Sequence, residues 1–294
     1  MGAKNGLSLR QLMARPGIIV APGAYDMLSA LLIERAGFGC IYMTGNGQTA
    51  SALGLPDLGL VTLSEMAERV RHTRACTSLP IIADADVGYG SMLSVRRAVQ
   101  EFENAGASGL HIEDQASPKK CGHELGRQLV TPEEMIGRIR AAVDARQTLD
   151  TIIIARTDAR TTLGLSEAIR RGRAYADAGA DVVFVESPES EDEFKEVARS
   201  IPVPTLANMV ESGRSPYLTW SRLQELGFKI AIYPGSAVCA AAGAVQAVLG
   251  EIRDHGRVED AKNSMMTLEQ YHDVLHFNEM AALEERYHAP PVPN

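Results

Sequence analysis

Short runs of apolar, mostly β-branched residues alternate with longer helical patterns along the whole chain, in a unit of roughly thirty residues. In several units the helical pattern ends in Ala-Gly or Leu-Gly, as at Ala36-Gly37, Ala105-Gly106 and Leu226-Gly227. Glycine accepts the left-handed conformation that ends a helix, and the apolar run that follows is short enough to be a buried parallel strand. The pattern predicts eight strands, at residues 17–21, 39–43, 80–84, 109–113, 151–156, 181–186, 203–207 and 228–233.

Capping residues mark where two of the helical stretches begin. The segment Thr131–Glu134 places a capping hydroxyl, a first-turn proline and two acidic side chains at the positive end of one helix. The segment Thr62–Glu65 fits a capping box. Helices therefore separate the predicted strands, and the pattern is that of repeated strand–helix units.

Eight strand–helix units in 294 residues predict an α/β fold with one (β/α)₈ TIM barrel domain spanning residues 1–294. The alternative is a doubly wound open sheet. That fold usually carries a glycine-rich phosphate turn after its first strand, where this chain has Ala21-Pro22-Gly23-Ala24. After the eighth strand, two further helical stretches are predicted at 237–255 and 264–287. A barrel needs only one helix there, so we expect residues 237–294 to form a helical extension used in oligomerisation.

The formal net charge is −8, with 45% hydrophobic and 22% charged residues, which is an ordinary globular balance. The negative charge argues against a nucleic-acid partner, which needs a basic face. No uninterrupted apolar run reaches the roughly 18 residues of a membrane span, and the N-terminal segment lacks an apolar signal core. The four cysteines show no CxxC pair and no zinc spacing, so we expect free thiols in a cytoplasmic protein without a membrane partner.

Polar residues follow the ends of the otherwise apolar strands, where barrel enzymes carry their catalytic groups. Asp84 and Asp86 come at the end of the third predicted strand, and Glu113 at the end of the fourth. Together these carboxylates form an all-oxygen set, which suits Mg²⁺ or Mn²⁺. For Asp84 and Asp86 taken alone, turn formation is the alternative. The third acid on the neighbouring strand favours a metal site.

Two further features of the strand ends carry candidate chemistry. Arg156 follows the fifth strand, where it would either bind a substrate carboxylate or form an ion pair with Glu186 or Asp158. The segment Lys119–His123 places the Cys121 thiol among cationic neighbours. Such neighbours can lower a cysteine pKa from about 8.5 to between about 3.5 and 7.5, which predicts proton transfer or nucleophilic attack. The alternative is a surface basic cluster around an inert, packed cysteine.

Six motifs lie in a specific order along the chain. They are Tyr42–Gly45, Asp84–Gly90, Glu113–Gln115, Lys119–His123, Ala155–Ala159 and Ala207–Glu211. In this order and spacing they resemble the isocitrate lyase/phosphoenolpyruvate mutase superfamily, and the match runs over nearly the whole length. The Lys-Lys-Cys-Gly-His segment is similar to that of the carbon–carbon lyase branch, because the carbon–phosphorus enzymes of the superfamily lack the cysteine.

The resemblance implies a barrel that depends on Mg²⁺, with Mn²⁺ as the alternative, and whose subunits exchange a C-terminal helix in a homodimer or homotetramer. It implies a metal site, in part through water, made of Asp57, Asp84, Asp86 and Glu113. Arg156, Thr44 and the Gly45 amide would hold the carboxylate of a 2-oxo acid. The other candidate substrate-binding residues are Asn46, Gly122, His123, Asn208 and Ser236.

A mechanism also follows from the resemblance. The carbon–carbon bond of a 2-hydroxy acid would open in a retro-aldol, Claisen-like step to give a 2-oxo acid such as pyruvate and a carboxylate-stabilised carbanion. Cys121 would protonate that carbanion as general acid, with Tyr42 a candidate for the base. His123 and Glu186 would tune the thiol or the loop around it.

Two segments bear on the substrate. Superfamily members that cleave 2-methylisocitrate commonly carry a basic residue soon after the Gly-His pair, where this chain has Glu124-Leu125-Gly126. The segment Asn208–Glu211 is closer to the 2-alkylmalate lyases and oxaloacetate hydrolases. We therefore expect a 2-alkylmalate or 2,3-dimethylmalate, with 2-methylisocitrate close behind. The alternatives are an oxaloacetate hydrolase giving oxalate and acetate, a phosphonate-processing member of the superfamily, and a non-catalytic metabolite sensor.

Overall fold

The computed structural model describes residues 7–122 and 124–288. Eight parallel strands close into a barrel in sequence order, with β1 paired to both β2 and β8. The (β/α)₈ prediction is confirmed and the open-sheet alternative is wrong. The strands are β1 (Ile19–Ala24), β2 (Ile41–Met43), β3 (Ile81–Asp84), β4 (Gly109–Glu113), β5 (Ile152–Thr157), β6 (Val182–Val185), β7 (Thr205–Asn208) and β8 (Ile230–Tyr233).

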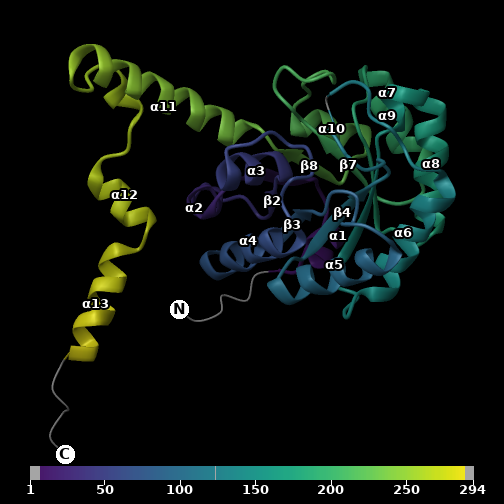
Figure 1. Ribbon diagram of the computed structural model, residues 1–294, viewed down its shortest axis with the longest axis horizontal. Helices are drawn as coiled ribbons and strands as arrows, with labels where there is room; N and C mark the ends of the chain where they lie inside the picture. Colours follow the sequence, from purple (N-terminus) through teal and green to yellow (C-terminus); the bar gives the residue numbers. More distant parts are fainter. Residues whose placement is uncertain (1–6, 123, 289–294) are drawn as a thin grey trace, which may run out of the picture. The chain divides into compact units, whose positions relative to one another are not determined.

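Helices follow the strands and surround them, as Figure 1 shows. Thr131 accepts a hydrogen bond from the Glu134 amide at 3.2 Å, and Thr62 accepts one from the Glu65 amide at 3.4 Å, so both predicted helix starts are confirmed. The helices are α1 (Leu9–Ala14), α2 (Met27–Arg35), α3 (Gly45–Leu53), α4 (Leu63–Cys76), α5 (Met92–Ala105), α6 (Pro132–Ala145), α7 (Ala159–Leu163), α8 (Leu165–Asp177), α9 (Glu191–Ser200) and α10 (Trp220–Leu226).

Side chains alternate along each strand between the interior of the barrel and its helical layer. Ile82, Ile154, Phe184 and Leu206 belong to one buried cluster inside the barrel, which Leu9 of α1 joins. The residues next to them along the strands pack against the surrounding helices. A polar residue two positions beyond an interior apolar residue therefore points to the barrel axis at the carboxyl end of its strand. This alternation of side chains determines where the candidate site lies.

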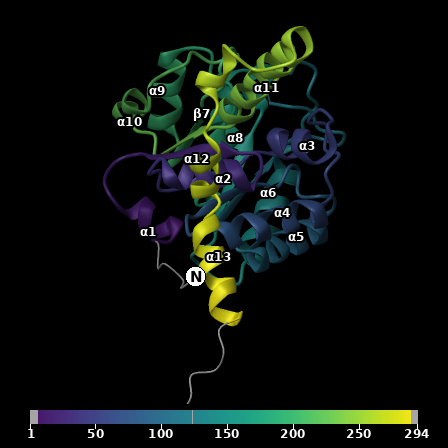
Figure 2. The ribbon, with the colours of Figure 1, turned by 90° about the vertical axis from the view of Figure 1, so that its left-hand side faces the viewer.

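Residues Cys239–Asn294 form a compact unit separate from Met1–Val238. Helix α11 (Ser236–His255) follows the prediction. The second predicted helix, at 264–287, is not continuous. After the short η1 (Ala261–Ser264), it consists of α12 (Leu268–Val274) and α13 (Phe277–His288), which Figure 2 shows as two coils. His276 lies between them with φ of 55°, a left-handed conformation that a continuous α-helix excludes. Among the described helices, none is long and apolar enough to cross a membrane.

Candidate active site

Five polar side chains lie at the carboxyl ends of neighbouring strands, two positions after interior residues. All five are buried, and Glu113 is paired in register with Arg156 across β4 and β5. Because the strand period is two residues, the same alternation that fills the barrel also directs these groups to its axis. The five residues are Asp84, Glu113, Arg156, Glu186 and Asn208.

Lys119 lies among the predicted metal-binding acids. Its Nζ is 2.5 Å from Oδ1 of Asp57 and 2.5 Å from Oδ1 of Asp86. Burial opposes the charge on Lys119, but Asp86, Glu113, Asp84 and Asp57 raise its pKa well above the ordinary value. The lysine is therefore an ammonium ion, and it holds the loop after β4 against the loops that carry Asp57 and Asp86.

The two aspartates of the Asp84-x-Asp86 motif ionise differently. Burial raises the pKa of Asp86 to about 6, although Lys119 opposes the shift. Burial acts in the same sense on Asp84, but His111, Lys119 and Arg156 outweigh it and lower the Asp84 pKa to about 2. Asp84 Oδ1 also accepts a hydrogen bond of 2.9 Å from the Asp86 amide. Asp84 is thus the permanent carboxylate of the pair.

The predicted metal site is an all-oxygen set rather than a closed cage. Within residues 7–122 and 124–288, no three His, Cys, Asp or Glu side chains are arranged to hold a metal ion directly. Glu113 Oε1 is nevertheless buried without a hydrogen-bond partner in the described structure. Mg²⁺ commonly keeps several waters and binds through only one or two carboxylates. The donor chemistry of these residues suits a hydrated Mg²⁺ ion, and its binding by Asp57, Asp84, Asp86 and Glu113 stays a prediction.

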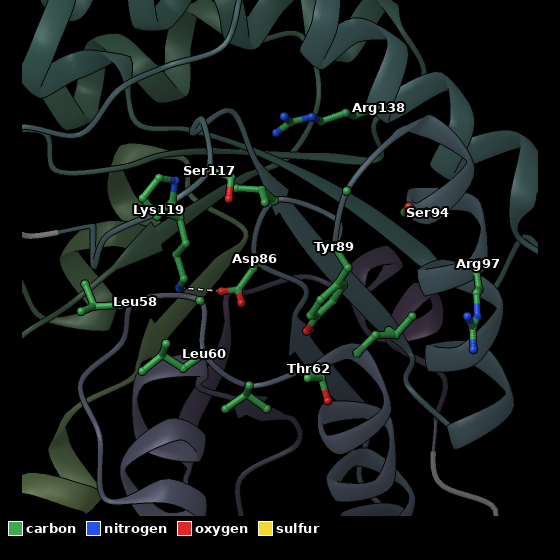
Figure 3. Close-up of a pocket in the computed structure, with 16 residues that line it drawn as sticks. Leu58, Leu60, Thr62, Asp86, Tyr89, Ser94, Arg97, Ser117, Lys119 and Arg138 are labelled. Atoms are coloured by element: carbon green, nitrogen blue, oxygen red, sulfur yellow. Dashed lines mark ion pairs between the residues drawn. The ribbon is translucent and has the colours of Figure 1, made fainter.

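A cavity of about 580 Å³ opens beside the ion pair between Asp86 and Lys119. Figure 3 shows the two side chains facing each other, with the Tyr89 ring on one side of them, Leu58 on the other and Leu60 below. Asp86 and Tyr89 have φ values of 49° and 61°, which few non-glycine residues adopt. Strained backbone of this kind persists where the surroundings over-determine it, and it is frequent at functional sites. The loop after β3 thus presents a carboxylate and a phenol to one cavity.

Arg156 is surrounded by carboxylates inside the barrel. Its Nη1 is 3.2 Å from Glu113 Oε2, and its Nη2 is 3.1 Å from Asp158 Oδ1 and 3.3 Å from Glu186 Oε2. Burial opposes its charge, but Asp158, Glu113 and Glu186 raise the Arg156 pKa well above the ordinary value. The ion pairs that the sequence left as an alternative are therefore present, and carboxylate binding by Arg156 stays a prediction.

The loop that carries Cys121 touches the Arg156–Glu186 pair. Cys121 is half-buried and forms no disulfide. A Cβ added to Gly122 would overlap the Arg156 guanidinium and lie 2.9 Å from Glu186 Oε2, so only glycine fits at this approach. His123 lies outside the described residues. The backbone directly after the candidate acid is thus packed on the candidate substrate-binding arginine.

Tyr42 lies inside the barrel beside His111. Its hydroxyl is 2.8 Å from His111 Nε2 and 3.5 Å from Asp84 Oδ2. Burial, with the nearby Asp84 charge, raises the pKa of Tyr42 well above its ordinary value, and burial lowers the pKa of His111. In this arrangement Tyr42 is a protonated phenol, and His111 is a fully buried residue of the barrel interior.

The segment at the start of α3 holds three predicted substrate-binding residues. Thr44 is buried and caps the helix by accepting a hydrogen bond from the Gly47 amide at 3.4 Å. The Gly45 amide donates to Asp84 Oδ2 at 3.3 Å, and a Cβ at Gly45 would overlap that carboxylate. Asn46 is exposed. The Gly45 amide, predicted to bind a substrate carboxylate, thus faces the Asp84 carboxylate.

Two further predicted substrate-binding residues have different surroundings. Asn208 Nδ2 donates to Glu186 Oε2 at 3.0 Å, which places this amide beside the arginine cluster. Ser236, at the start of α11, donates to Glu211 Oε1 at 2.5 Å. The structure therefore brings Asn208 to the barrel axis, while Ser236 bonds to the loop after β7.

Arg127 is a buried residue of the site that the sequence analysis did not single out. Its Nη1 lies 2.5 Å from Asp158 Oδ1, and it also donates to the Gly122 carbonyl. Arg127 directly follows Gly126, the last residue of the segment in which a basic side chain was expected after the Gly-His pair. A basic residue after a glycine in a catalytic loop was the available signal.

Asp114 directly follows β4, and its side chain lies on the opposite side of the strand from that of Glu113. Its carboxylate accepts hydrogen bonds from Thr157 Oγ1 at 2.7 Å, Tyr175 Oη at 2.8 Å and Arg171 Nη1 at 3.0 Å, and from the Asp158 amide at 2.9 Å. All of these partners come from β5 and the turn after it, or from α8. Asp114 therefore anchors the segment that carries Asp158, from outside the barrel.

Comparisons with known proteins agree with this geometry. Residues 9–253 match the family described as phosphoenolpyruvate phosphomutase. The chain is 44% identical over 279 residues to 2,3-dimethylmalate lyase of Eubacterium barkeri, covering 95% of this chain and 96% of that protein. It is 43% identical over 276 residues to 2-methylisocitrate lyase of Aeropyrum pernix, covering 94% and 89%.

Solved structures show the same likeness. Oxaloacetate acetylhydrolase in complex with 3,3-difluorooxalacetate superposes with a TM-score of 0.91 at 36% identity, over 97% of each chain. 2,3-Dimethylmalate lyase in its trigonal crystal form superposes with a TM-score of 0.88 at 38% identity, over 95% of this chain and 93% of that one. The likeness therefore extends over the barrel and the helices that follow it.

Proposed function

This chain belongs to the phosphoenolpyruvate phosphomutase family, in the PEP mutase/isocitrate lyase superfamily, and from that premise we propose that it is a carbon–carbon lyase. It cleaves a 2-hydroxy di- or tricarboxylate of the 2-alkylmalate, 2,3-dimethylmalate or 2-methylisocitrate type. The products are a 2-oxo acid such as pyruvate and a second carboxylate. The names of the relatives at 44% and 43% identity support this substrate class.

The observation that carries the proposal is the contact between the Cys121 loop and Arg156. Gly122 packs so closely on Arg156 and Glu186 that a Cβ at this position would force these side chains to shift. A substrate carboxylate held by Arg156 would therefore lie next to the backbone that presents the Cys121 thiol. The reaction requires one group to orient the acid and one to deliver a proton, besides a base for the substrate hydroxyl.

Mg²⁺ is the cofactor we propose for this site, with Mn²⁺ as its substitute. Asp84, Asp86 and Glu113, with Asp57, would hold it, partly through water, because they are the oxygen donors at the carboxyl end of the barrel. When bound, the ion would supply a Lewis acid for the negative charge that develops on the substrate hydroxyl. Lys119 pairs with Asp57 and Asp86, and its ammonium group balances part of their negative charge.

The residues divide the chemistry between them. Loss of the substrate hydroxyl proton opens the carbon–carbon bond, and the bonding electrons move to the carbon that bears the second carboxylate. The Cys121 thiol donates its proton to that carbon as general acid. Tyr42 remains the candidate base. Because it is a protonated phenol, it would receive the hydroxyl proton while its own proton passes to His111 Nε2, 2.8 Å away. Glu186, paired with Arg156 at 3.3 Å, keeps the guanidinium oriented.

A second candidate function is hydrolysis of oxaloacetate to oxalate and acetate. Its support is the TM-score of 0.91 with oxaloacetate acetylhydrolase over 97% of each chain. The two activities use the same arginine, acids and thiol but release different products. Phosphonate processing is a weaker alternative, because the resemblance associates the Cys121 segment with the carbon–carbon enzymes.

A substrate panel tests the proposal. The purified protein, with Mg²⁺ present, is offered 2-ethylmalate, 2,3-dimethylmalate, 2-methylisocitrate and oxaloacetate separately. Release of a 2-oxo acid from one of the first three, abolished by a chelator, is the expected result. Oxalate from oxaloacetate without cleavage of the others would replace the lyase with the hydrolase. Tight binding of pyruvate or oxalate without any turnover would favour a sensor.

The C-terminal extension, residues 237–294, is proposed as the oligomerisation element of the barrel domain. Its described helices expose large apolar side chains, among them Leu249 at 59% and Phe277 at 53%. Exposed apolar surface of this kind is typical of subunit contacts. We expect a homodimer or homotetramer by light scattering, and dissociation when Leu249 and Phe277 are changed to glutamate. We also propose a cytoplasmic location, which the absence of disulfides among the described cysteines supports.

A further inference from the structure

Arg127 joins the Cys121 loop to the barrel through a single carboxylate. Its Nη1 donates both to the Gly122 carbonyl and to Asp158 Oδ1. The same Asp158 carboxylate accepts hydrogen bonds from Arg156 Nε and Nη2, each at 3.1 Å. One anion therefore holds the arginine of the loop and the arginine of the barrel at the same time.

Asp158 is well placed to act as a fixed point. Its backbone amide donates to Asp114 Oδ1 at 2.9 Å, and Asp114 also accepts hydrogen bonds from Thr157 and Tyr175. These partners belong to β5 and α8, which are packed elements of the barrel. The position of Asp158, and of the two guanidinium groups it binds, is therefore set by the rigid part of the fold.

Stability alone does not explain an arginine at position 127. The side chain is fully buried, and its Nε and Nη2 have no hydrogen-bond partner in the part of the chain that the structure describes. Buried donors without partners are destabilising, and each one in a native protein calls for a functional or structural reason. A methionine would fill a similar volume without this penalty.

We propose that Arg127 is a positioning residue for the lyase reaction. It fixes the Gly122 carbonyl to Asp158, so that the Cys121 thiol keeps a constant distance from the carboxylate that Arg156 binds. Proton delivery to a carbanion depends on such distances, and a displacement of about 1 Å can lower a rate about 100-fold. The inference rests on the proposed function, in which Cys121 is the proton donor.

The first test compares Arg127→Met with Arg127→Lys. Arg127→Met is expected to lower kcat about 100-fold, while KM stays nearly unchanged because Arg156 keeps its contacts with Glu113 and Glu186. Arg127→Lys should restore most of kcat, because one nitrogen makes both contacts of Arg127. The melting temperature of Arg127→Met should fall only slightly, because Asp158 loses one buried partner but keeps two hydrogen bonds from Arg156.

Arg146→Met is the matched control. Arg146 Nη1 also donates to one carbonyl, of Thr151 at 3.2 Å, and to one carboxylate, of Asp181 at 2.7 Å, but at the amino-terminal end of β5. This variant should lose melting temperature and keep kcat. If Arg127→Met behaves in the same way, or keeps both properties, Arg127 has no positioning role.

A second measurement needs no substrate. The rate at which iodoacetamide alkylates Cys121 is followed by mass spectrometry, with Cys76 and Cys239 in the same sample as internal standards. Release of the Gly122 carbonyl in Arg127→Met should change the Cys121 rate at least severalfold and leave the standards unchanged. An unchanged Cys121 rate would overturn the inference. Because labelling is independent of turnover, failure of the proposed lyase activity would be recognised separately.

Discussion

Lys119 places its ammonium nitrogen 2.5 Å from Oδ1 of Asp86, and both side chains are buried. The lysine comes from the loop that carries Cys121, and the aspartate from the strained loop after β3. A buried pair of this kind is destabilising to break, because removal of one partner leaves an uncompensated charge. The contact therefore couples the position of the Cys121 loop to the charge of the predicted metal site.

Replacement of Lys119 by methionine should make folding stability depend on divalent metal. Without the ammonium group, Asp57 and Asp86 lose the cationic partner that they share, and a bound metal ion can replace it. We expect a loss of about 3 kcal/mol in the presence of a chelator, and a larger increase in melting temperature on addition of Mg²⁺ than in the wild type. Lys120→Met, whose Nζ lies 3.5 Å from the Leu125 carbonyl, is the control. Equal Mg²⁺ responses in all three proteins would contradict the prediction.

Replacement of Cys121 by serine should abolish most turnover. A hydroxyl is a much weaker acid than a thiol, so the carbanion loses its proton donor, and kcat should fall by about 10²–10⁴. Steady-state release of the 2-oxo acid gives the measurement. Cys239→Ser is the control, because Cys239 is exposed and lies in α11. Turnover within a few-fold of wild type in Cys121→Ser would reject the role of the thiol.

Replacement of Gly122 by alanine should disrupt the site without unfolding the barrel. The new Cβ would overlap the Arg156 guanidinium and press on Glu186, so both groups must move. We expect kcat/KM to fall about 100-fold, on the scale that small displacements in active sites produce. Gly39→Ala is the matched control, because a Cβ at Gly39 meets no atom of the described chain within 4 Å. The two variants should have similar far-ultraviolet circular dichroism, and equal activity would show that the loop contact is unimportant.

Replacement of Asp114 by asparagine should reduce stability more than any surface aspartate. The carboxylate accepts hydrogen bonds from Arg171 Nη1 at 3.0 Å, Tyr175 Oη and Thr157 Oγ1. Asparagine keeps the shape but removes the negative charge that faces Arg171 Nη1, while Glu167 still pairs with Arg171 Nε. We therefore expect a loss of about 3 kcal/mol, at the lower end for a broken buried pair. Urea unfolding measures the difference in free energy. The exposed Asp150→Asn should change it by less than about 0.5 kcal/mol.

Glu167 should contribute a stability term that disappears in acid. Its hydrogen bonds to Arg170 and Arg171 lower its pKa to about 2, against an ordinary value of 4.5. Because the folded pKa is depressed, the contribution is complete above about pH 4.5 and is lost as pH falls towards 2. For this partly exposed pair we expect about 1 kcal/mol between wild type and Glu167→Gln at pH 7. A difference that is as large at pH 2 as at pH 7 would exclude the ion pair as its source.

Much of the fold could be predicted because its causes are local. The eight strands and the helix starts at Thr62 and Thr131 follow from short-range periodicity and capping, and the structure confirms them. The prediction of one continuous helix at 264–287 was wrong, and the reason cannot be read from the periodicity of apolar residues. His276 adopts a left-handed conformation that divides the apolar pattern into two helices.

The sequence by itself determined which acids and which arginine point to the barrel axis. Strand alternation sets the direction of Asp84, Glu113 and Arg156 once the interior residues are known, because the period of two admits no other phase. It also determined that a thiol follows the acidic strand. These properties depend on neighbours within a few residues along the chain.

The partners of those groups were decided only by the tertiary structure. The ion pair between Lys119 and Asp57 joins residues 62 positions apart (119 − 57), and Arg127 meets Asp158 from 31 positions away. No local pattern records such contacts, because they form only when closure of the barrel brings the loops after β2, β4 and β5 to one end. The sequence therefore specifies which charged residues a buried site contains. Tertiary packing decides which of these charges form ion pairs and so neutralise each other.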